Sequence, residues 1–339
     1  MIRVLLVDDS VTVRRALQRE LAKYPDFEVV GAAADPYEAR ELIAMHRPDV
    51  ITLDLQMPRM GGLEFLEKIM RHHPLPVIVL SSVAAENSEP ALRALELGAL
   101  EVIQKPDSAN SLFSVGKRLA TALREGARAR VRGVQPLSGS RLRLPQTFTT
   151  KRLIGIGAST GGIQAIERLV RVLPATLPGV VIAQHLPAEF TDSFARRLNQ
   201  YSEIEIREAR NGDLVTTGTA LVAPGGLHTR ICDDDGVLRV LLEDTPAVNY
   251  QKPSVDVLFD SIAEAAGADS IGILLTGMGG DGASGLRNIR DAGGYTVVQS
   301  METCVVFGMP KEAIARGAAQ VIAPLDSIAE LIVSAVSRA

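Results

Sequence analysis

Short apolar segments alternate with segments of helical spacing along this chain, and that alternation restricts the fold more than any other feature. In the first 125 residues the strand-like segments lie at 4–7, 28–33, 50–53, 76–80 and 100–103, and the helical ones at 13–23, 36–46, 63–71, 90–97 and 108–125. Strands that alternate with helices in this way form parallel sheets with helices packed on them. We therefore predict an α/β protein that begins with a doubly wound (βα)5 domain.

Charge divides the chain into three parts. Residues 1–125 carry 15 basic and 18 acidic side chains, residues 126–152 carry seven basic and no acidic ones, and residues 153–339 carry 14 basic and 22 acidic ones. The basic part also holds glycines and prolines and has no helical period, which is typical of a tether. We predict a first domain over residues 1–122, a basic linker over 123–148 and a second domain over 149–339.

Composition excludes several classes of protein. The 339 residues contain no run of about 18 apolar ones, which argues against a transmembrane helix, and the N-terminus lacks the cleavage site of a signal peptide. Two cysteines, Cys232 and Cys304, cannot form a disulfide framework, and no CxxC or HExxH pattern indicates zinc. We expect both cysteines to pack in the interior, and we expect a cytoplasmic protein without membrane insertion.

Polar residues follow the predicted strands of the first domain. Asp8 and Asp9 follow the first strand, Asp54 the third, Ser81 the fourth and Lys105 the fifth. The carboxyl ends of parallel strands meet at one edge of the sheet, where three carboxylates repel each other unless a cation such as Mg²⁺ lies among them. Single acidic residues after strands are common on surfaces. The full set favours a site at which Asp54 is transiently phosphorylated as a nucleophile, with a lysine and a hydroxyl beside the phosphate.

Together with the turn Met57-Pro58-Arg59-Met60-Gly61-Gly62, these residues resemble the receiver domain of two-component response regulators over residues 1 to about 122. The resemblance implies a Mg²⁺ site and a phosphate site. The Mg²⁺ ligands would be Asp8, Asp9, Asp54 and the backbone carbonyl of Gln56, and the phosphate site would comprise Asp54 as acceptor, Ser81 as switch hydroxyl and Lys105 as phosphate partner. One departure is Gly61-Gly62, where many receivers have Asp-Gly, and because the position is a turn we expect no loss of function.

The second half opens with a strand-like segment at 153–157, followed by a Gly-rich turn and a helical segment at 163–173. One interpretation is a phosphate-binding turn. However, its glycine spacing is one residue longer than the dinucleotide fingerprint, and Gln184-His185 stands where an acid would bind the ribose. The other interpretation is a GxSxG nucleophile elbow centred on Ser159. Ser159 could also serve only as a helix N-cap, so the choice between these roles depends on whether a base and a carboxylate lie beside it.

A serine nucleophile needs a base, and the second domain holds two histidines. His185 follows the strand at 180–184, so it lies at the same edge of the sheet as Ser159. His228 lies in a Gly-rich turn, and it could be the base, line the substrate pocket or be a loop histidine. We favour His185 as the base.

Asp281 is the candidate that would orient the histidine. It follows the strand at 271–275 within a Gly-rich segment, and it could instead cap the helix that comes next. Backbone amides near Thr160, Met278 and Gly279 are candidates for an oxyanion hole. The order serine, histidine, aspartate differs from that of α/β-hydrolases, so the GxSxG pattern does not indicate that fold.

These segments resemble the catalytic domain of the chemotaxis protein-glutamate methylesterase (CheB) family, an α/β domain with a mostly parallel sheet. The resemblance is carried by residues 156–162, 184–187, 223–226 and 275–283, and with the receiver and linker it covers essentially the whole chain. It implies a Ser159–His185–Asp281 triad that hydrolyses glutamate γ-methyl esters on chemoreceptor cytoplasmic helices and releases methanol. It also implies deamidation of receptor glutamines, and no cofactor is needed for either reaction.

Two classes of function remain open. The first is a phosphorylation-activated serine esterase for adaptation in chemotaxis, with a histidine kinase as phosphodonor and with an unphosphorylated receiver that blocks the catalytic edge. The second is a response regulator whose C-terminal half binds a nucleotide or a partner without catalysis. The intact set of candidate triad residues favours the first. The basic linker could bind nucleic acid, but its one aromatic residue is Phe148, so we favour a solvated tether and expect a monomer.

Overall fold

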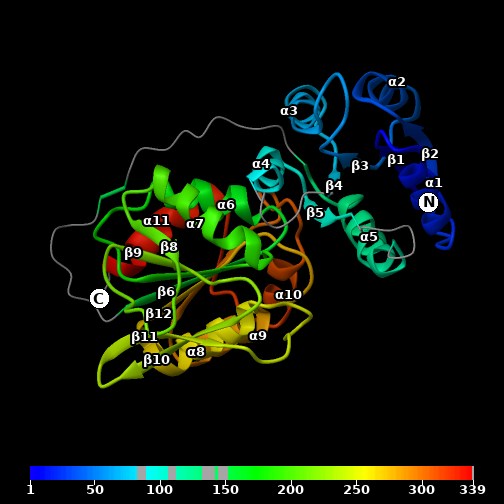
Figure 1. Ribbon diagram of the computed structural model, residues 1–339. Coiled ribbons are helices and arrows are strands. Elements are labelled where there is room, and N and C mark those ends of the chain that lie inside the picture. Colours follow the sequence, from blue (N-terminus) through cyan, green and yellow to red (C-terminus); the bar gives the residue numbers. More distant parts are fainter. Residues whose placement is uncertain (82–88, 106–111, 132–141, 144–151, 338–339) are drawn as a thin grey trace. The chain divides into compact units, whose positions relative to one another are not determined.

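The structure is a computed structural model that describes residues 1–81, 89–105, 112–131, 142–143 and 152–337. The chain forms two compact units, Met1–Pro136 and Leu137–Ala339. Each unit contains its own parallel sheet with helices packed against it (Figure 1). Most of the predicted linker, at 132–141 and 144–148, lies outside the described residues.

The first unit is built on a parallel sheet of strand order β2-β1-β3-β4-β5, which confirms the predicted doubly wound fold. The chain changes direction across the sheet between β1 and β3, and such a switch point is where α/β sheets bind ligands. The described elements are β1 (Ile2–Val7), α1 (Val11–Leu21), β2 (Phe27–Ala33), α2 (Pro36–His46), β3 (Val50–Asp54), α3 (Gly62–His72), β4 (Val77–Ser81), α4 (Glu89–Leu97), β5 (Glu101–Gln104) and α5 (Leu112–Gly126).

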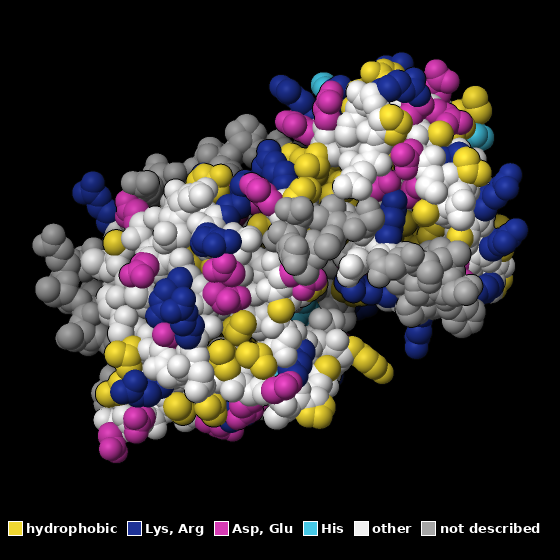
Figure 2. Space-filling view, in the orientation of Figure 1, with side chains coloured by type: hydrophobic (Ala, Val, Ile, Leu, Met, Phe, Trp, Pro, Cys, Tyr) yellow, Lys and Arg dark blue, Asp and Glu magenta, His cyan; other side chains and the backbone are white. Residues whose placement is uncertain are grey.

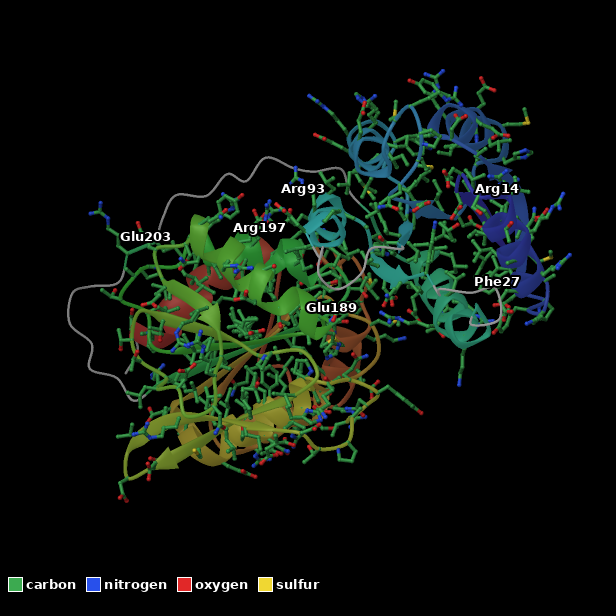
Figure 3. All side chains as sticks on the ribbon, viewed as in Figure 1. Arg14, Phe27, Arg93, Glu189, Arg197 and Glu203 are labelled. Atoms are coloured by element: carbon green, nitrogen blue, oxygen red, sulfur yellow. The ribbon has the colours of Figure 1, made fainter. Side chains whose placement is uncertain are left out.

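Helix α5 continues past residue 122, where we predicted the first domain to end. Leu123 is fully buried. Arg124 forms an ion pair with Asp26 at 2.6 Å, and its guanidinium lies 5.0 Å from the ring centroid of Phe27, which is labelled in Figure 3 at the start of β2. Residues 123–126 therefore pack with the first unit, while the exact domain boundaries remain a prediction.

The second unit contains a parallel sheet of strand order β14-β13-β12-β6-β7-β9-β8. The first strand of this unit, β6, lies inside the sheet between β7 and β12, so the switch point falls at β6. The described elements are β6 (Leu153–Ala158), α6 (Gly162–Val170), β7 (Val180–Gln184), α7 (Ala188–Tyr201), β8 (Glu205–Glu208), β9 (Thr219–Val222), β10 (His228–Asp234), β11 (Val237–Glu243), α8 (Val255–Ala266), the 3₁₀ turn η2 (Gly267–Asp269), β12 (Ser270–Leu274), α9 (Ala283–Asp291), β13 (Tyr295–Gln299), α10 (Met309–Ala315), β14 (Val321–Ala323) and α11 (Leu325–Ser337).

Strands β10 and β11 form a separate antiparallel hairpin. Asp235 and Gly236 at its tip have φ angles of 52° and 84°, as expected for the two central residues of a type I′ turn. Cys232 on β10 is exposed, so our expectation that it packs in the interior is wrong, whereas Cys304 is buried as expected. The alternation of the hairpin explains the difference, because β10 has one face toward α8 and the other toward solvent.

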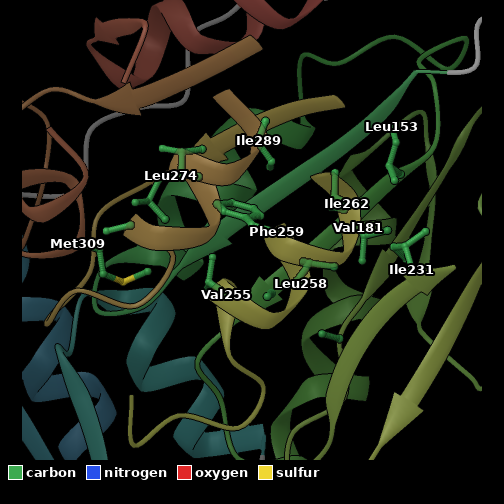
Figure 4. Close-up of a cluster of buried hydrophobic side chains, with 14 of the residues drawn as sticks. Leu153, Val181, Ile231, Val255, Leu258, Phe259, Ile262, Leu274, Ile289 and Met309 are labelled. Atoms are coloured by element: carbon green, nitrogen blue, oxygen red, sulfur yellow. The ribbon is translucent and has the colours of Figure 1, made fainter. Parts of the chain in front are cut away.

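Helices α8 and α9 pack closely on the centre of the second sheet (Figure 4). Phe259 of α8 is fully buried among residues of the neighbouring strands. This approach requires glycine on two adjacent strands: a Cβ at Gly155 would lie 2.6 Å from Ile262 Cδ1, and a Cβ at Gly272 would lie 2.6 Å from Leu286 Cδ1. The close packing fixes the N-termini of both helices at the carboxyl edge of the sheet.

The surface of the second unit is mixed in character. Figure 2 shows basic, acidic and apolar side chains interspersed on the visible face rather than gathered by sign. Within the part of the chain that the structure describes, no helix combines the length and apolar character needed to span a membrane.

Candidate active site

Ser159 and His185 lie side by side at the carboxyl edge of the second sheet. Strands β6 and β7 pair in parallel with Ala158 opposite Gln184, so each candidate is the next residue on its strand. The His185 amide donates to the Ala158 carbonyl at 3.1 Å, which extends the strand pairing by one step. Paired strands lie about 4.8 Å apart, and the register therefore brings together two residues that are 26 positions apart in sequence.

The backbone around Ser159 is held from both neighbouring strands. Its amide donates to the Thr276 carbonyl at 3.0 Å on the β12 side. Its carbonyl accepts the Gly162 amide at 2.8 Å and the Gln184 Nε2 amide at 2.9 Å on the β7 side. Gly161, the N-cap of α6, has a φ of 79°, a conformation that glycine adopts without steric cost. The turn is therefore rigid, as a nucleophile elbow must be.

Asp281 accepts a hydrogen bond from His185 Nε2 at 2.8 Å. The two side chains are almost completely buried. Burial tends to raise the pKa of the Asp281 carboxyl, but hydrogen bonds from His185, Asn249 and Ser254 outweigh it, so the pKa lies below its usual value. An ionised Asp281 fixes the proton of His185 on Nε2. His185 Nδ1 is buried and has no hydrogen-bond partner among the described residues, so its lone pair remains available to a substrate or a nucleophile.

The other bonds of Asp281 come from the N-terminus of α8. The Val255 and Asp256 amides donate to its carboxylate at 2.6 and 3.3 Å, and Ser254 Oγ donates at 2.7 Å. Our alternative, that Asp281 caps the helix that follows it, is wrong: Gly282 is the N-cap of α9 and no side chain caps that end. The α8 dipole and amides stabilise the negative charge on Asp281.

Three backbone amides near Ser159 stay unpaired within the described residues. The amides of Thr160, Met278 and Gly279 donate to no protein acceptor there, whereas the neighbouring Gly277 amide donates to Val306 at 3.1 Å. Gly279 has a φ of 80°, which turns the loop after β12. These amides have the character that an oxyanion hole requires, because they are donors held by a rigid backbone.

His228 is fully buried at the start of β10. Its Nε2 contacts the Pro246 carbonyl at 3.1 Å, and its Nδ1 accepts the Ser254 amide at 3.2 Å. Both ring nitrogens are therefore engaged, with the proton on Nε2. This arrangement favours His185 as the base and gives His228 a supporting position behind Ser254, the residue that bonds Asp281.

The first unit places its acidic residues together at the β1/β3 switch point. Ligand oxygens of Asp8, Asp9 and Asp54 lie within 4.8 Å of one another. Lys105 Nζ lies 2.6 Å from both Asp8 Oδ2 and Asp54 Oδ2. Burial raises the pKa of the Asp54 carboxyl, against the opposing effects of Lys105 and of the Gln56 amide. Such a cluster of oxygen donors can hold a divalent cation.

The remaining predicted receiver residues surround this cluster. Ser81 ends β4, one position beyond Leu80, which pairs with Asp54, and its carbonyl accepts the Lys105 amide at 2.7 Å. The Gln56 amide donates to Asp54 Oδ1 at 3.2 Å. A Cβ at Gly61 would contact nothing within 4 Å, so the departure at this turn leaves the packing unchanged.

Sequence reasoning missed four residues that support the second site. Gln184 and Thr276 hold the Ser159 turn, and Ser254 and Asn249 bond Asp281. Gln184 and Thr276 stand beside predicted residues at strand ends, so their positions could have been noticed. Asn249 and Ser254 lie before a helix that we did not predict, and no local pattern indicates which carboxylate they bind.

Residues 154–332 match the CheB methylesterase family, and residues 4–115 match the response regulator receiver domain. The chain belongs to the CheB methylesterase family. Both CheB-type domains occur in the predicted order, which confirms the resemblance and the α/β fold class.

Relatives of the CheB family match this chain over nearly its whole length. It is 46% identical over 337 residues to a protein-glutamate methylesterase/protein-glutamine glutaminase of Syntrophus aciditrophicus, with 98% of each chain covered. It is 50% identical over 331 residues to one from Anaeromyxobacter dehalogenans, covering 97% of this chain and 93% of that one. The solved CheB methylesterase catalytic domain of Thermotoga maritima is 36% identical with a TM-score of 0.53, and the match covers 54% of this chain and 97% of that one.

Proposed function

We propose that this protein is a phosphorylation-regulated serine esterase that hydrolyses glutamate γ-methyl esters on chemoreceptor helices. The observation that carries the proposal is the arrangement of Ser159 and His185 at matched strand ends, with His185 Nε2 bonded to Asp281 at 2.8 Å. The printed names of the relatives, protein-glutamate methylesterase/protein-glutamine glutaminase, support the same activity.

In the proposed mechanism, His185 Nδ1 takes the proton of Ser159 Oγ while the oxygen attacks the ester carbonyl. The carbonyl oxygen becomes negative and accepts hydrogen bonds from amides of Thr160, Met278 and Gly279. His185 then gives its proton to the leaving methoxide, and methanol departs from the acyl-enzyme. Water, deprotonated by the same nitrogen, hydrolyses the acyl-enzyme and restores Ser159.

The same groups would deamidate a glutamine side chain. The amide carbonyl has the same shape as the ester, and the proton from His185 Nδ1 would convert the leaving nitrogen into ammonia. Asp281 stays ionised throughout and stabilises the imidazolium that forms when His185 takes up the proton.

The esterase proposal is tested by methanol release from a methylated receptor fragment. Ser159→Ala should lower the rate about 10⁴-fold or more, while the control Ser193→Ala, on α7, should match the parent. A fluorophosphonate that labels the parent and not Ser159→Ala would support the nucleophile. If it labels neither protein and no methanol forms, the C-terminal half is a binding module instead.

The first unit would control this activity through Asp54. Asp8, Asp9, Asp54 and the Gln56 carbonyl would hold Mg²⁺, and the cluster of carboxylate oxygens fits such an ion. Bound Mg²⁺ would neutralise charge on an incoming phosphoryl group. Asp54 would attack the phosphorus, Lys105 would pair with the transferred group, and Ser81 would donate a hydrogen bond to it. A histidine kinase would supply the phosphoryl group.

We infer that the unphosphorylated receiver restricts access of the substrate, because one chain combines a switch domain with a hydrolase. Acetyl phosphate should raise the methanol release of the parent and leave that of Asp54→Asn unchanged. Removal of residues 1–147 should raise the rate above that of the unphosphorylated parent. If removal gives no increase, inhibition by the receiver is excluded. A cytoplasmic location and a monomeric state remain predictions.

A further inference from the structure

The turn at residues 248–251 connects the protein surface to Asp281. Val248 and Gln251 pair across the turn through backbone bonds of 3.2 and 2.9 Å. Between them, the Asn249 side-chain amide donates to Asp281 Oδ1 at 3.0 Å and to Asp256 Oδ2 at 2.8 Å. A single amide group thus bridges two buried carboxylates from the tip of a turn.

The effect of this bridge depends on its second carboxylate, Asp256. Asp256 lies in the first turn of α8, where its Oδ1 accepts the Gly285 amide at 2.8 Å. Burial and the nearby Asp281 charge both raise the pKa of the Asp256 carboxyl. Asn249 donates to both groups, and without it each of the two carboxylates would lose one hydrogen bond that offsets their mutual repulsion. The bridge therefore favours the position in which Asp281 contacts His185.

Tyr250, the next residue, is 98% exposed. Asn249 and Tyr250 have φ angles of 52° and 64°, the pattern of a type I′ turn, which favours Asn followed by Gly. Asparagine adopts this conformation readily, whereas a bulky tyrosine does so only at a steric cost. A strained and solvent-exposed aromatic side chain, next in sequence to the residue that bonds Asp281, indicates a role in binding.

We propose that this turn both positions the triad and binds the substrate: Asn249 is a positioning residue that holds Asp281 on His185, and Tyr250 packs on the apolar face of the helical substrate beside the esterified glutamate. A tyrosine suits this role because it combines a large apolar ring with a hydroxyl. The inference rests on the proposed esterase function and names a specificity residue for it.

The Tyr250 part is tested with two substrates, a methylated receptor helix and the small ester N-acetylglutamate γ-methyl ester. For Tyr250→Ala and Tyr250→Gly, the ratio of kcat/KM for the helix to that for the small ester should fall about tenfold, as expected for a contact residue near the centre of an interface. Tyr250→Gly should also raise Tm, because glycine removes the strain. Val237→Ala, at the tip of the β10–β11 hairpin and 42% exposed in the parent, should keep the parental ratio.

Asn249 is tested through kcat and its pH dependence. Asn249→Ala should lower kcat about tenfold for both esters with little change in KM. Asn249→Asp has nearly the same shape but adds a third carboxylate facing Asp281 and Asp256, with His185 beyond them. Its kcat should be lower still at pH 8. As the pH falls, the introduced carboxyl takes up a proton and can donate to Asp281, so kcat should recover relative to the parent.

Each part has an outcome that overturns it. An unchanged ratio in both Tyr250 variants excludes substrate binding by this turn, and parental kcat values with a parental pH profile in both Asn249 variants exclude the positioning role. If the parent itself hydrolyses neither ester, the proposed function fails and the inference fails with it. If the parent is active on both esters, the proposed function stands, and a negative result with the variants then counts against the inference alone.

Discussion

Asp54 and Asp281 are both buried carboxylates at the carboxyl edge of a parallel sheet, yet their pKa values move in opposite directions. The pKa of Asp54 is raised, because burial outweighs Lys105 and the Gln56 amide. The pKa of Asp281 is lowered, because hydrogen bonds from His185, Asn249 and Ser254 outweigh a similar burial. The direction of the pKa shift therefore depends on the number and kind of hydrogen-bond donors rather than on how deeply each carboxylate is buried.

The difference fits two kinds of chemistry. Asp54 has few donors within the described residues, so its oxygens stay available to a cation and to a phosphoryl group. Asp281 is surrounded by hydrogen-bond donors and faces the N-terminus of α8, so its position is fixed and its carboxylate stays ionised. The first arrangement suits a reactive carboxylate, and the second suits a carboxylate that orients a histidine.

Replacing Asp281 by a neutral residue is the strongest test of the difference between the two carboxylates. Asp281→Asn should lower kcat about 10⁴-fold, because an amide neither stabilises the imidazolium nor keeps the proton of His185 on Nε2. Methanol release at saturating substrate measures the effect. Asp260→Asn on α8 is the matched control, since Asp260 accepts a bond from Asn288 and none from the triad, and it should retain nearly full activity.

The helix after each proposed nucleophile begins with a glycine, Gly62 in α3 and Gly162 in α6. The second prediction concerns Gly62. A Cβ at Gly62 would lie 2.1 Å from the Asp54 carbonyl oxygen, whereas one at Gly61 would contact nothing within 4 Å. Gly62→Ala should destabilise the receiver by about 2–3 kcal/mol, and Gly61→Ala by less than about 0.5 kcal/mol. Hydrogen exchange of the β1 and β3 amides measures both. Equal effects would contradict the steric argument.

Thr276 offers a smaller test of how the second site is held. Thr276 is 1% exposed. Its hydroxyl donates to the Thr160 carbonyl at 3.0 Å and accepts the Val305 and Val306 amides at 3.1 and 3.0 Å. Thr276→Val keeps the shape and loses these bonds, so kcat should fall about tenfold as the oxyanion amides shift. Thr276→Ser should restore most of it. A valine variant with parental kcat would exclude this role.

The smallest expected effect is the pH dependence of stability. The lowered pKa of Asp281 stabilises the second domain above the unfolded value of about 3.9, and this contribution disappears as the pH falls through the folded pKa. The raised pKa of Asp54 has the opposite sign: its ionisation destabilises the receiver above the folded pKa, and the penalty disappears as the pH falls. Hydrogen exchange of each domain between pH 3 and 7 should give slopes that Asp281→Asn and Asp54→Asn change in opposite directions.

Much of both sites follows from local sequence. Asp54 ends β3 and Ser159 directly follows β6, and parallel pairing brings all such positions to one edge. Parallel pairing likewise predicts His185 beside Ser159, and the register of β6 and β7 agrees with this. The Asp235-Gly236 tip of the hairpin also carries its own signal, because type I′ turns need residues that tolerate positive φ.

Other features depend on groups that are far apart in sequence. We allowed that Asp281 caps the next helix, and it binds the start of α8 instead, 25 or 26 residues earlier in the chain. Both helices begin near this carboxylate, and local propensity cannot distinguish them. His228 is a second candidate base by sequence, but its two ring nitrogens bond to the Pro246 carbonyl and the Ser254 amide.

By itself, the sequence determined the α/β class, the order of the two domains and the residues at the strand ends, since each rests on periodicity and on the geometry of parallel pairing. Only the tertiary structure decided which donors surround each carboxylate, which histidine keeps a free nitrogen and which turn bonds Asp281. The physical reason is that strand ends are arranged by local repeats, whereas the charge state of a buried group depends on every partner that folding brings within hydrogen-bond distance.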